Sequence, residues 1–357
     1  MLTHIVCRLQ SNGKQILIRS SRRSNAITNK IKTYFTSYLG EITSGTGAIP
    51  LTPRRVSDNS VVGTAEEITS DIILPDSRIP STPEIGSESN AGDMSTEWNI
   101  DEQDDLFEGV FNDTWDDTDW DAEDNTGTKV LTLDDDTKSF LLLKHYPQNP
   151  AQYQLFEKVY VNQLSMDFAT DSFVKLTWNL MGSNNPEKVG SLPSYIDGAN
   201  TRSLTLGEKL TTKSFLTKTG WLKIGDTLGT LAAVRQSPSM NITINNNLER
   251  TPALFEEESI ENSLGDFVID GSIDIYNVDA LGTSLYNDAV AGKDKVIQVN
   301  VERMIGTMKY QYILTMDVHL KAPSESKNGN KLQFTVGFQV NDTTNLKLEK
   351  VVTDTSI

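Results

Sequence analysis

The sequence predicts a mainly β protein with short helices, and three observations lead to that prediction. Over residues 159–181, apolar and polar side chains alternate in two runs separated by a short polar turn. A period of two with one apolar face is typical of a hairpin that is buried on one side and wetted on the other. A similar alternation runs through 310–321 and 331–340, with the polar loop 324–330 between them. Two such hairpins in one chain indicate a duplicated module.

Size and composition narrow the function classes. A chain of 357 residues can bury ordinary cores without a metal, and its single cysteine, Cys7, cannot form an internal disulfide. The net charge of −17 argues against tight binding of nucleic acid, because that affinity comes mostly from cations that meet phosphates. The sequence has no apolar run of the ~20 residues that a membrane span needs and no signal peptide. We therefore expect a soluble product without membrane contact.

The first 37 residues differ in charge from the rest. Residues 1–37 carry seven Lys and Arg side chains and no acidic ones. Within them, Asn12 and Gly13 lie between two short apolar runs, a pair typical of a tight hairpin turn. We expect a basic, flexible N-terminal extension, and the alternative is a basic arm that docks on an acidic neighbour.

A first module is expected over residues 38–183. It opens with a loop rich in Gly, Pro and Thr, and its strands before the hairpin are predicted at 66–74, 92–99, 130–133 and 139–145. A helix is predicted over 101–111, because acidic residues fill its first turn and Leu106 pairs with Val110 at a spacing of four. An acidic loop, 112–127, is expected to follow the helix.

A second module is expected over residues 237–357, after a connecting region at 184–236 with a hairpin around 213–224. Its strands before the second hairpin are predicted at 240–244, 269–275 and 296–301. Between the last two, Asp279 is a candidate N-cap for a helix that buries Leu281, Leu285 and Ala289 and ends at Gly292. Strand, acidic cap, helix, strand and hairpin thus follow in the same order in both modules.

Catalytic signatures are lacking in the sequence. Asp117, Asp119 and Asp121 have the spacing of an EF-hand loop, but the sixth and twelfth positions lack the Gly and Glu that such a loop needs. His319 shares a strand face with Asp317, yet no marked nucleophile accompanies them. We therefore predict a protein that is not an enzyme, with no catalytic residues, no metal and no cofactor.

Several weak motifs become specific through their order along the chain. They are the Gly, Thr and Pro loop, two strands, a helix and two longer segments, at 45–53, 66–74, 92–115, 138–168 and 240–255. In this order they resemble the tail tube, or major tail, proteins of long-tailed bacteriophages, from about Tyr38 to the end of the chain. The basic extension before that point departs from the family pattern.

The resemblance implies a structural virion protein with two tandem modules. Each module would be a β-sandwich or barrel with one flanking helix, and their long hairpins would join across subunits into an inner β-barrel. Stacked rings would form the tail tube through which DNA enters the host, with tape-measure, terminator and tip proteins as partners. Because single-module relatives form hexameric rings, the doubled pattern implies a homotrimeric ring with pseudo-sixfold symmetry, a hexamer being the alternative. Assembly would take place in the host cytoplasm.

The polar faces of the two hairpins are predicted to look into the channel, where DNA passes without specific binding. The predicted lumen residues are Gln163, Ser165, Asp167, Thr177, Asn179, Gln311, Thr315, Asp317, Gln333 and Gln339, together with His319. Lys175 and Lys321 share these faces and are expected near the faces of the ring. A surface loop or a contact between rings is predicted for Asp116, Asp117, Asp119 and Asp121. The alternative function is a two-domain β-sandwich adhesin, on a virion or a cell surface, that binds a protein or a glycan.

Overall fold

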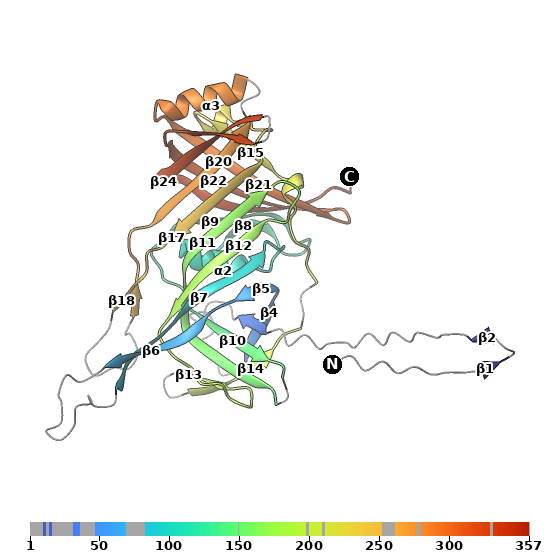
Figure 1. Ribbon diagram of the computed structural model, residues 1–357, viewed down its shortest axis with the longest axis vertical. Coiled ribbons are helices and arrows are strands. Elements are labelled where there is room, and N and C mark those ends of the chain that lie inside the picture. Colours follow the sequence, from blue (N-terminus) through green and yellow to red (C-terminus); the bar gives the residue numbers. More distant parts are fainter. Residues whose placement is uncertain are drawn as a thin grey trace. The chain divides into compact units, whose positions relative to one another are not determined.

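A computed structural model describes residues 10–11, 14–15, 31–35, 47–68, 83–148, 150–197, 200–208, 211–251, 261–276, 280–328 and 331–356. Strands make up 63% of the structure, and the described part includes two short helices, α2 (Asp104–Phe111) and α3 (Ala280–Val290) (Figure 1). The predicted mainly β fold with short helices is therefore confirmed. The chain forms two compact units, residues 1–30 and residues 31–357.

The first unit contains a short hairpin. Strand β1 (Gln10–Ser11) pairs antiparallel with β2 (Lys14–Gln15), as a two-residue turn at 12–13 predicts. The second unit begins at Ile31, and β3 (Lys32–Phe35) belongs to it, with Phe35 fully buried. The last residues of the predicted basic extension therefore lie in the second unit.

Six antiparallel strands form the central sheet of the second unit (Figure 1). Their order across the sheet is β7 (Glu84–Glu97), β12 (Lys175–Gly182), β11 (Gln152–Ala169), β17 (Ser239–Asn245), β20 (Val268–Tyr276) and β24 (Lys331–Asp354). The pair β11–β12 is the first predicted hairpin, with Leu164 opposite Trp178. Strand β11 also pairs with β17 over seven residues, so both halves of the chain share one sheet.

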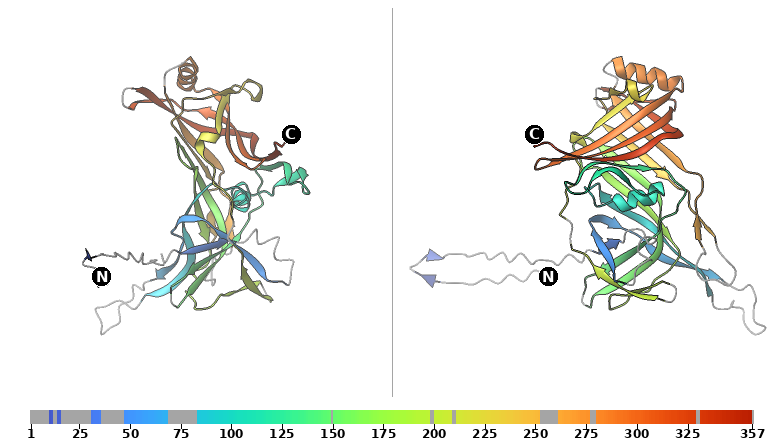
Figure 2. Two further views of the ribbon diagram at one scale, coloured as in Figure 1. Left: turned by 90° about the vertical axis from the view of Figure 1, so that its right-hand side faces the viewer. Right: turned by 180° about the vertical axis from the view of Figure 1, so that it is seen from behind.

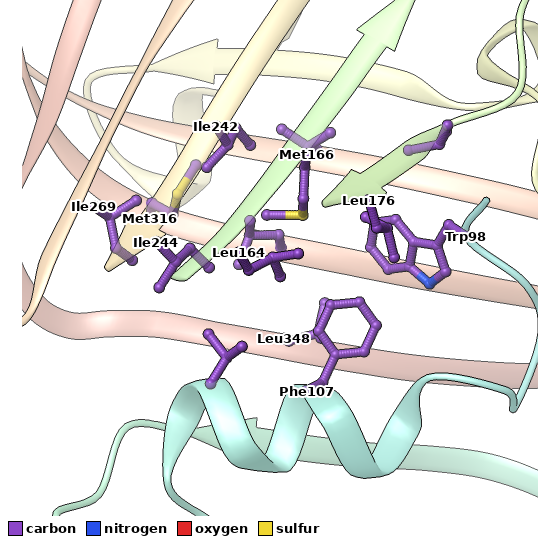
Figure 3. Packing of buried hydrophobic residues seen from close by; sticks show 14 of the residues in the cluster. Trp98, Phe107, Leu164, Met166, Leu176, Ile242, Ile244, Ile269, Met316 and Leu348 are labelled. Carbon is purple, nitrogen blue, oxygen red and sulfur yellow. The ribbon is translucent and has the colours of Figure 1, made fainter. Parts of the chain in front are cut away.

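One face of the central sheet builds the main core. Alternate side chains such as Leu164, Met166 and Trp178 are at most 1% exposed, and Figure 3 shows several of them meeting side chains from other strands. The alternation in the sequence predicts this face, because successive side chains of a strand point to opposite sides. Gly271 of β20 leaves room for Phe338, since an added Cβ would lie 2.4 Å from the Phe338 Cζ atom.

Helix α2 covers this core, and Figure 3 shows Phe107 pointing from the helix toward the sheet. The helix begins at Asp104 and not at residue 101 as predicted, because Asp101 has a left-handed backbone (φ 61°) that cannot continue a helix. Asp104 and Asp105 fill the first turn, where the helix dipole favours acidic groups. Asn112, with φ 54°, ends the helix.

The second predicted hairpin pairs differently from the expectation. The sequence predicts that β22 (Met308–Leu320) pairs with 331–340, but most of β22 pairs with the far half of β24, where Leu314 lies opposite Leu348. The near half of β24 pairs with β20 on one side and, on the other, with the short strand β23 (Ser324–Asn328) and with the last residues of β22, where His319 lies opposite Gln339. The predicted pairing is therefore wrong for most of the strand, because the segment expected to be a loop contains β23.

The connecting region also differs from the expectation. The predicted hairpin around 213–224 is wrong, because this segment contains the 3-10 helix η1 (Thr217–Thr219) and then β15 (Trp221–Gly225). Strand β15 pairs with β16 (Ala232–Ala233), after the 3-10 helix η2 (Leu228–Thr230). On its other side β15 pairs with β21 (Asp294–Ile305), which pairs with β22 and contains the strand predicted at 296–301.

The acidic segment after α2 is a hairpin and not the predicted loop. Strand β8 (Asp116–Asp121) pairs with β9 (Thr126–Thr132), and β9 pairs with the far half of β24. Gly127 permits the close approach of the two strands, because its φ is 119° and an added Cβ would lie 2.2 Å from the carbonyl oxygen of Asp119. The sequence favours a loop here because Asp is depleted in strands.

A smaller cluster of buried side chains, including Ile49, Leu51, Leu141 and Leu143, lies beside the first part of β11. It is built by β3, β4 (Ile49–Arg54), β10 (Phe140–Tyr146), β13 (Ser194–Asp197) and β14 (Asn200–Leu206). Helix α3 lies at one end of the second unit and β13 at the other in each view (Figure 1, Figure 2).

The remaining strands complete the edges. They are β5 (Val56–Asn59) and β6 (Val62–Ile68), which both pair with β7, and β18 (Glu249–Thr251), which pairs with β19 (Glu261–Ser263). Of the strand predicted at 66–74, the last six positions lie outside the described residues, and so does the predicted cap Asp279. Helix α3 ends before Gly292, whose φ is 60°, as predicted.

Candidate functional site

The face of the central sheet opposite the main core is polar across all six strands. Residues that pair across a sheet point to the same side, so the register defines rows of neighbouring side chains. One row consists of Glu97, Lys175, Asp167, Asn241, Ser272 and Gly337. The next row consists of Ser95, Thr177, Ser165, Thr243, Asp270 and Gln339. All of these residues are exposed or half-buried, and we call this surface the polar sheet face.

Hydrogen bonds between neighbouring strands engage four of the donors on the polar sheet face. The amide of Asn179 donates to Asp93 at 2.8 Å, and the amide of Asn241 donates to Asp167 at 2.7 Å. Asp274 accepts two hydroxyl hydrogen bonds of 2.5 Å, from Ser239 and Thr335. Each of these amide and hydroxyl groups therefore donates to a carboxylate of the same chain, which reduces the number of donors left for a phosphate oxygen.

The charge of the polar sheet face is negative. Its carboxylates are those of Asp93, Glu97, Asp167, Asp270 and Asp274. Lys175 is a cation within the two rows, and its register places it between Glu97 and Asp167. Neighbouring carboxylates on both sides lower the attraction that this ammonium group exerts on a passing anion.

A model of the phage tail tube protein family matches residues 35–340, most of the chain. The chain belongs to the phage tail tube protein family. The resemblance drawn from the sequence is thus confirmed, and with it a structural role in a virion component that assembles with itself into a tube. A comparison with curated proteins finds no match.

The tail tube sheet brings most of the predicted first-hairpin residues together. Ser165, Asp167, Thr177 and Lys175 lie in the two rows, and Gln163 lies opposite Asn179 one pair further along. From the second hairpin, Gln339 joins the same face through its pairing with Asp270. Gln333 lies on β24 as well, but it is 8% exposed.

The other predicted residues lie on β22, outside the six-stranded sheet. Thr315 is fully buried and accepts a hydrogen bond of 3.1 Å from the Gln298 amide. Asp317 accepts a hydrogen bond of 2.8 Å from Asn345, and Gln311 donates one of 3.2 Å to Glu302. The imidazole of His319 lies 2.9 Å from Asp294.

Two strands outside the predicted channel-lining set contribute six polar residues, as many as the first hairpin does. They are β17 and β20, with Ser239, Asn241, Thr243, Asp270, Ser272 and Asp274. Their apolar alternation is visible in the sequence at 240–244 and 269–275, so their intervening residues could have been assigned to the same face. What the sequence does not indicate is that β17 pairs with β11.

The predicted acidic residues of the tail tube protein lie on β8. Asp116, Asp117, Asp119 and Asp121 are all exposed. Hydrogen bonds from the hydroxyl and backbone N–H groups of Thr118 lower the pKa of Asp116. Asp121 accepts a backbone hydrogen bond of 2.9 Å from Glu123 in the following turn.

The described ranges hold no group of three or more His, Cys, Asp or Glu side chains arranged to bind a metal ion. Nor is any helix in that part of the chain both long and apolar enough to cross a bilayer.

Proposed function

We propose that this tail tube protein assembles into stacked rings and that its polar sheet face lines the channel through which DNA passes to the host. The polar sheet face is the single observation that carries the proposal. It extends over six strands of one chain, and the residues of its two rows are exposed or half-buried on the side opposite the main core. An assembled channel needs such a broad, continuous surface.

The chemistry of the polar sheet face suits passage without binding. Carboxylates repel phosphate, and several neutral donors already bind neighbouring carboxylates. Affinity for DNA comes mostly from Lys and Arg groups that replace counterions, and Lys175 lies between two acidic residues. DNA would therefore find few sites at which to stall.

A homotrimeric ring with pseudo-sixfold symmetry is our proposed assembly, with a hexamer as the alternative. Three strands of the polar sheet face come from the first half of the chain and three from the second. Each chain would thus supply two wall segments of an inter-subunit barrel, which is what two tandem modules at 38–183 and 237–357 would contribute. Closing the sheet into a barrel would remove its unpaired edges.

Partners and place of assembly follow from the same proposal. The tape-measure protein would occupy the channel before DNA, and the terminator and tip proteins would bind the two ends of the tube. Assembly would take place in the host cytoplasm. The basic residues before Ile31 would lie near neighbouring subunits, whose net charge is negative.

Thiol labelling tests the channel assignment. In a Cys7→Ser background, Ser165→Cys and Ser272→Cys place single thiols on the polar sheet face, and Ser284→Cys places one on the exposed side of α3 as a control. Free and assembled protein would be treated with a small maleimide and with a bulky polyethylene-glycol maleimide. We expect assembly to protect the two sheet thiols from the bulky reagent only, while Ser284→Cys reacts with both.

Three results would contradict the proposal. Equal reaction of Ser165→Cys with the bulky reagent in both states would place the polar sheet face on the outside of the tube. Protection from both reagents would place it in a subunit interface. A strictly monomeric wild-type particle at high concentration, seen by sizing and negative-stain microscopy, would favour the adhesin alternative.

A further inference from the structure

An open groove of about 640 Å³ lies where the channel-facing strands β11 and β17 meet their connecting segments. Its walls come from the turn after β11, from η1 and β15, from β16 and from the start of β17. Phe168, Trp221, Val234 and Met240 contribute apolar surface to it. The polar sheet face borders the groove, because Ser239 belongs to both.

The charge of the groove is opposite to that of the protein. Its lining contains Lys218, Lys223 and Arg235 and a single carboxylate, Asp171, in a chain of net charge −17. Among the described residues, no ion pair joins these three cations to a carboxylate. The Lys223 ammonium group instead lies 4.0 Å from the centroid of the Trp221 ring. The groove therefore presents a net positive charge beside an aromatic surface.

The same chain carries a complementary element. Strands β8 and β9 form an acidic hairpin. Strand β8 and the turn after it carry six exposed carboxylates, those of Asp116, Asp117, Asp119, Asp121, Glu123 and Asp124. Within the described residues, β8 pairs with β9 along one edge, and its other edge has no strand beside it. A hairpin is already ordered before it binds, so docking it costs less conformational entropy than docking a flexible loop.

We propose that the cationic groove of one copy receives the acidic β8 hairpin of a second copy. This contact rests on the proposed function, because it joins copies within the tube. The position of the groove supplies a reason for it. If the groove cations at the end of the polar sheet face were uncovered, they would bind DNA phosphates. Carboxylates from a neighbouring copy would neutralise these cations, so that DNA would not be held there.

Charge reversal tests the contact in the full-length protein. The groove variant Lys218→Glu with Arg235→Glu, and the hairpin variant Asp117→Lys with Asp119→Lys, each replace attraction by repulsion. We expect each to raise the concentration needed for tube assembly at least about tenfold, equivalent to about 1.4 kcal/mol. One chain with all four changes has complementary charges at every contact and should restore assembly to within about threefold of wild type, measured by sedimentation. The pair Lys188→Glu with Arg303→Glu, outside the groove, the β8 hairpin and the two rows, controls for net charge.

A second measurement locates the contact directly. In a Cys7→Ser background, Lys218→Cys and Asp119→Cys on separate copies should form a disulfide under mild oxidation when mixed under assembly conditions. Neither variant alone should give the cross-linked dimer. Circular dichroism of the unassembled variants would verify that each one is folded.

The outcomes separate this inference from the proposed function. Loss of assembly with complementary rescue supports the contact. Normal tubes from both charge-reversal variants would overturn the groove–hairpin contact and leave the tube proposal intact. The same conclusion would follow if the variant with all four changes failed to regain assembly. If the groove variant forms normal tubes but DNA no longer passes through them, the groove cations act on DNA phosphates and not on the hairpin of a second copy, and the proposed contact is overturned. If the wild-type protein forms neither rings nor tubes, the proposed function itself fails.

Discussion

The hydroxyl group of Tyr312 donates a hydrogen bond of 2.6 Å to the carboxylate of Asp104, which joins β22 in the second half of the chain to the first turn of α2 in the first half. Tyr312 is fully buried, and its ring centroid lies 5.4 Å from that of Trp98 and 5.5 Å from that of Phe215. Burial, together with the Asp104 carboxylate, raises the pKa of Tyr312 well above its usual value. The hydroxyl therefore remains a donor throughout the neutral range.

Removal of that hydroxyl should weaken the link between the two halves. Tyr312→Phe keeps the ring packing but deprives Asp104 of a buried donor, so we expect the free energy of unfolding to fall by about 1–3 kcal/mol. Urea unfolding followed by tryptophan fluorescence would measure the change. Tyr310→Phe, two residues away on the same strand and half-buried, serves as the control and should change stability by less than about 0.5 kcal/mol. Equal effects of the two substitutions would show that the hydrogen bond contributes nothing.

Lys350 is the second partner of Asp104. Its ammonium group lies 2.5 Å from Asp104 and also contacts Asp101, and the residue is 6% exposed. Lys350→Met should lower the free energy of unfolding by about 1–3 kcal/mol, because it leaves the half-buried Asp104 carboxylate without its cation, while the exposed Asp101 carboxylate can be solvated by water. On the same strand, Lys347 pairs with Glu349 at 3.0 Å in a more exposed setting, so Lys347→Met should cost at most about 1 kcal/mol.

A double-mutant cycle tests whether these two partners act through one carboxylate. Tyr312 and Lys350 both contact Asp104, so the combined substitutions should deviate from additivity by at least about 0.5 kcal/mol. Simple addition of the two single effects would mean that the contacts are independent. Urea unfolding of the wild type, the two single variants and the double variant gives the four free energies that the cycle compares.

Gly271 should tolerate no side chain. An alanine Cβ there would lie 2.4 Å from both the Asn241 carbonyl oxygen and the Phe338 ring, so Gly271→Ala should destabilise the fold by about 1–3 kcal/mol. Gly337 is the matched control, because it pairs with β20 on the polar side and its nearest neighbours, two atoms of Lys321, lie at an ordinary 3.5 Å. Gly337→Ala should therefore be close to neutral. Thermal unfolding of both variants would decide, and a neutral Gly271→Ala would show that Phe338 can move aside.

Lys144 should make stability depend on pH in the alkaline range. Its buried ammonium group donates to the carbonyl oxygens of Asn59, at 3.1 Å, and Val61, and burial lowers its pKa to about 8. Above that pH the unfolded chain still binds this proton and the folded chain does not. The free energy of unfolding should therefore rise from about pH 8 to about 9.5, by up to about 1.4 kcal/mol per pH unit.

The variant Lys144→Met should lose this rise in stability. Lys321→Met removes an exposed lysine and should keep it. Denaturant unfolding at half-unit steps between about pH 7.5 and 9.5 would provide the comparison, a window below the ordinary titration of tyrosine. The same slope in Lys144→Met as in the wild type would assign the pH dependence to another group.

The sequence predicts the half-buried strands well and the partners of those strands poorly. Leu164 to Phe168 and Leu176 to Leu180 alternate clearly, because a one-residue shift would move their apolar side chains into water. The pairing of β11 with β17 joins residues far apart in the chain, and no local pattern encodes it. Thr315 shows the same limit within the candidate site. Alternation assigns it to a polar face, but Gln298 on β21 covers it.

The seven-residue pairing of β11 with β17 has a consequence for assembly by mass action. A joint between separate molecules weakens on dilution, whereas this joint is intramolecular and keeps the same effective concentration at any protein level. In each copy, the β11–β17 pairing is therefore complete before any other copy binds. Dilution can separate neighbouring copies, but it leaves the joint between the two halves of the chain unchanged.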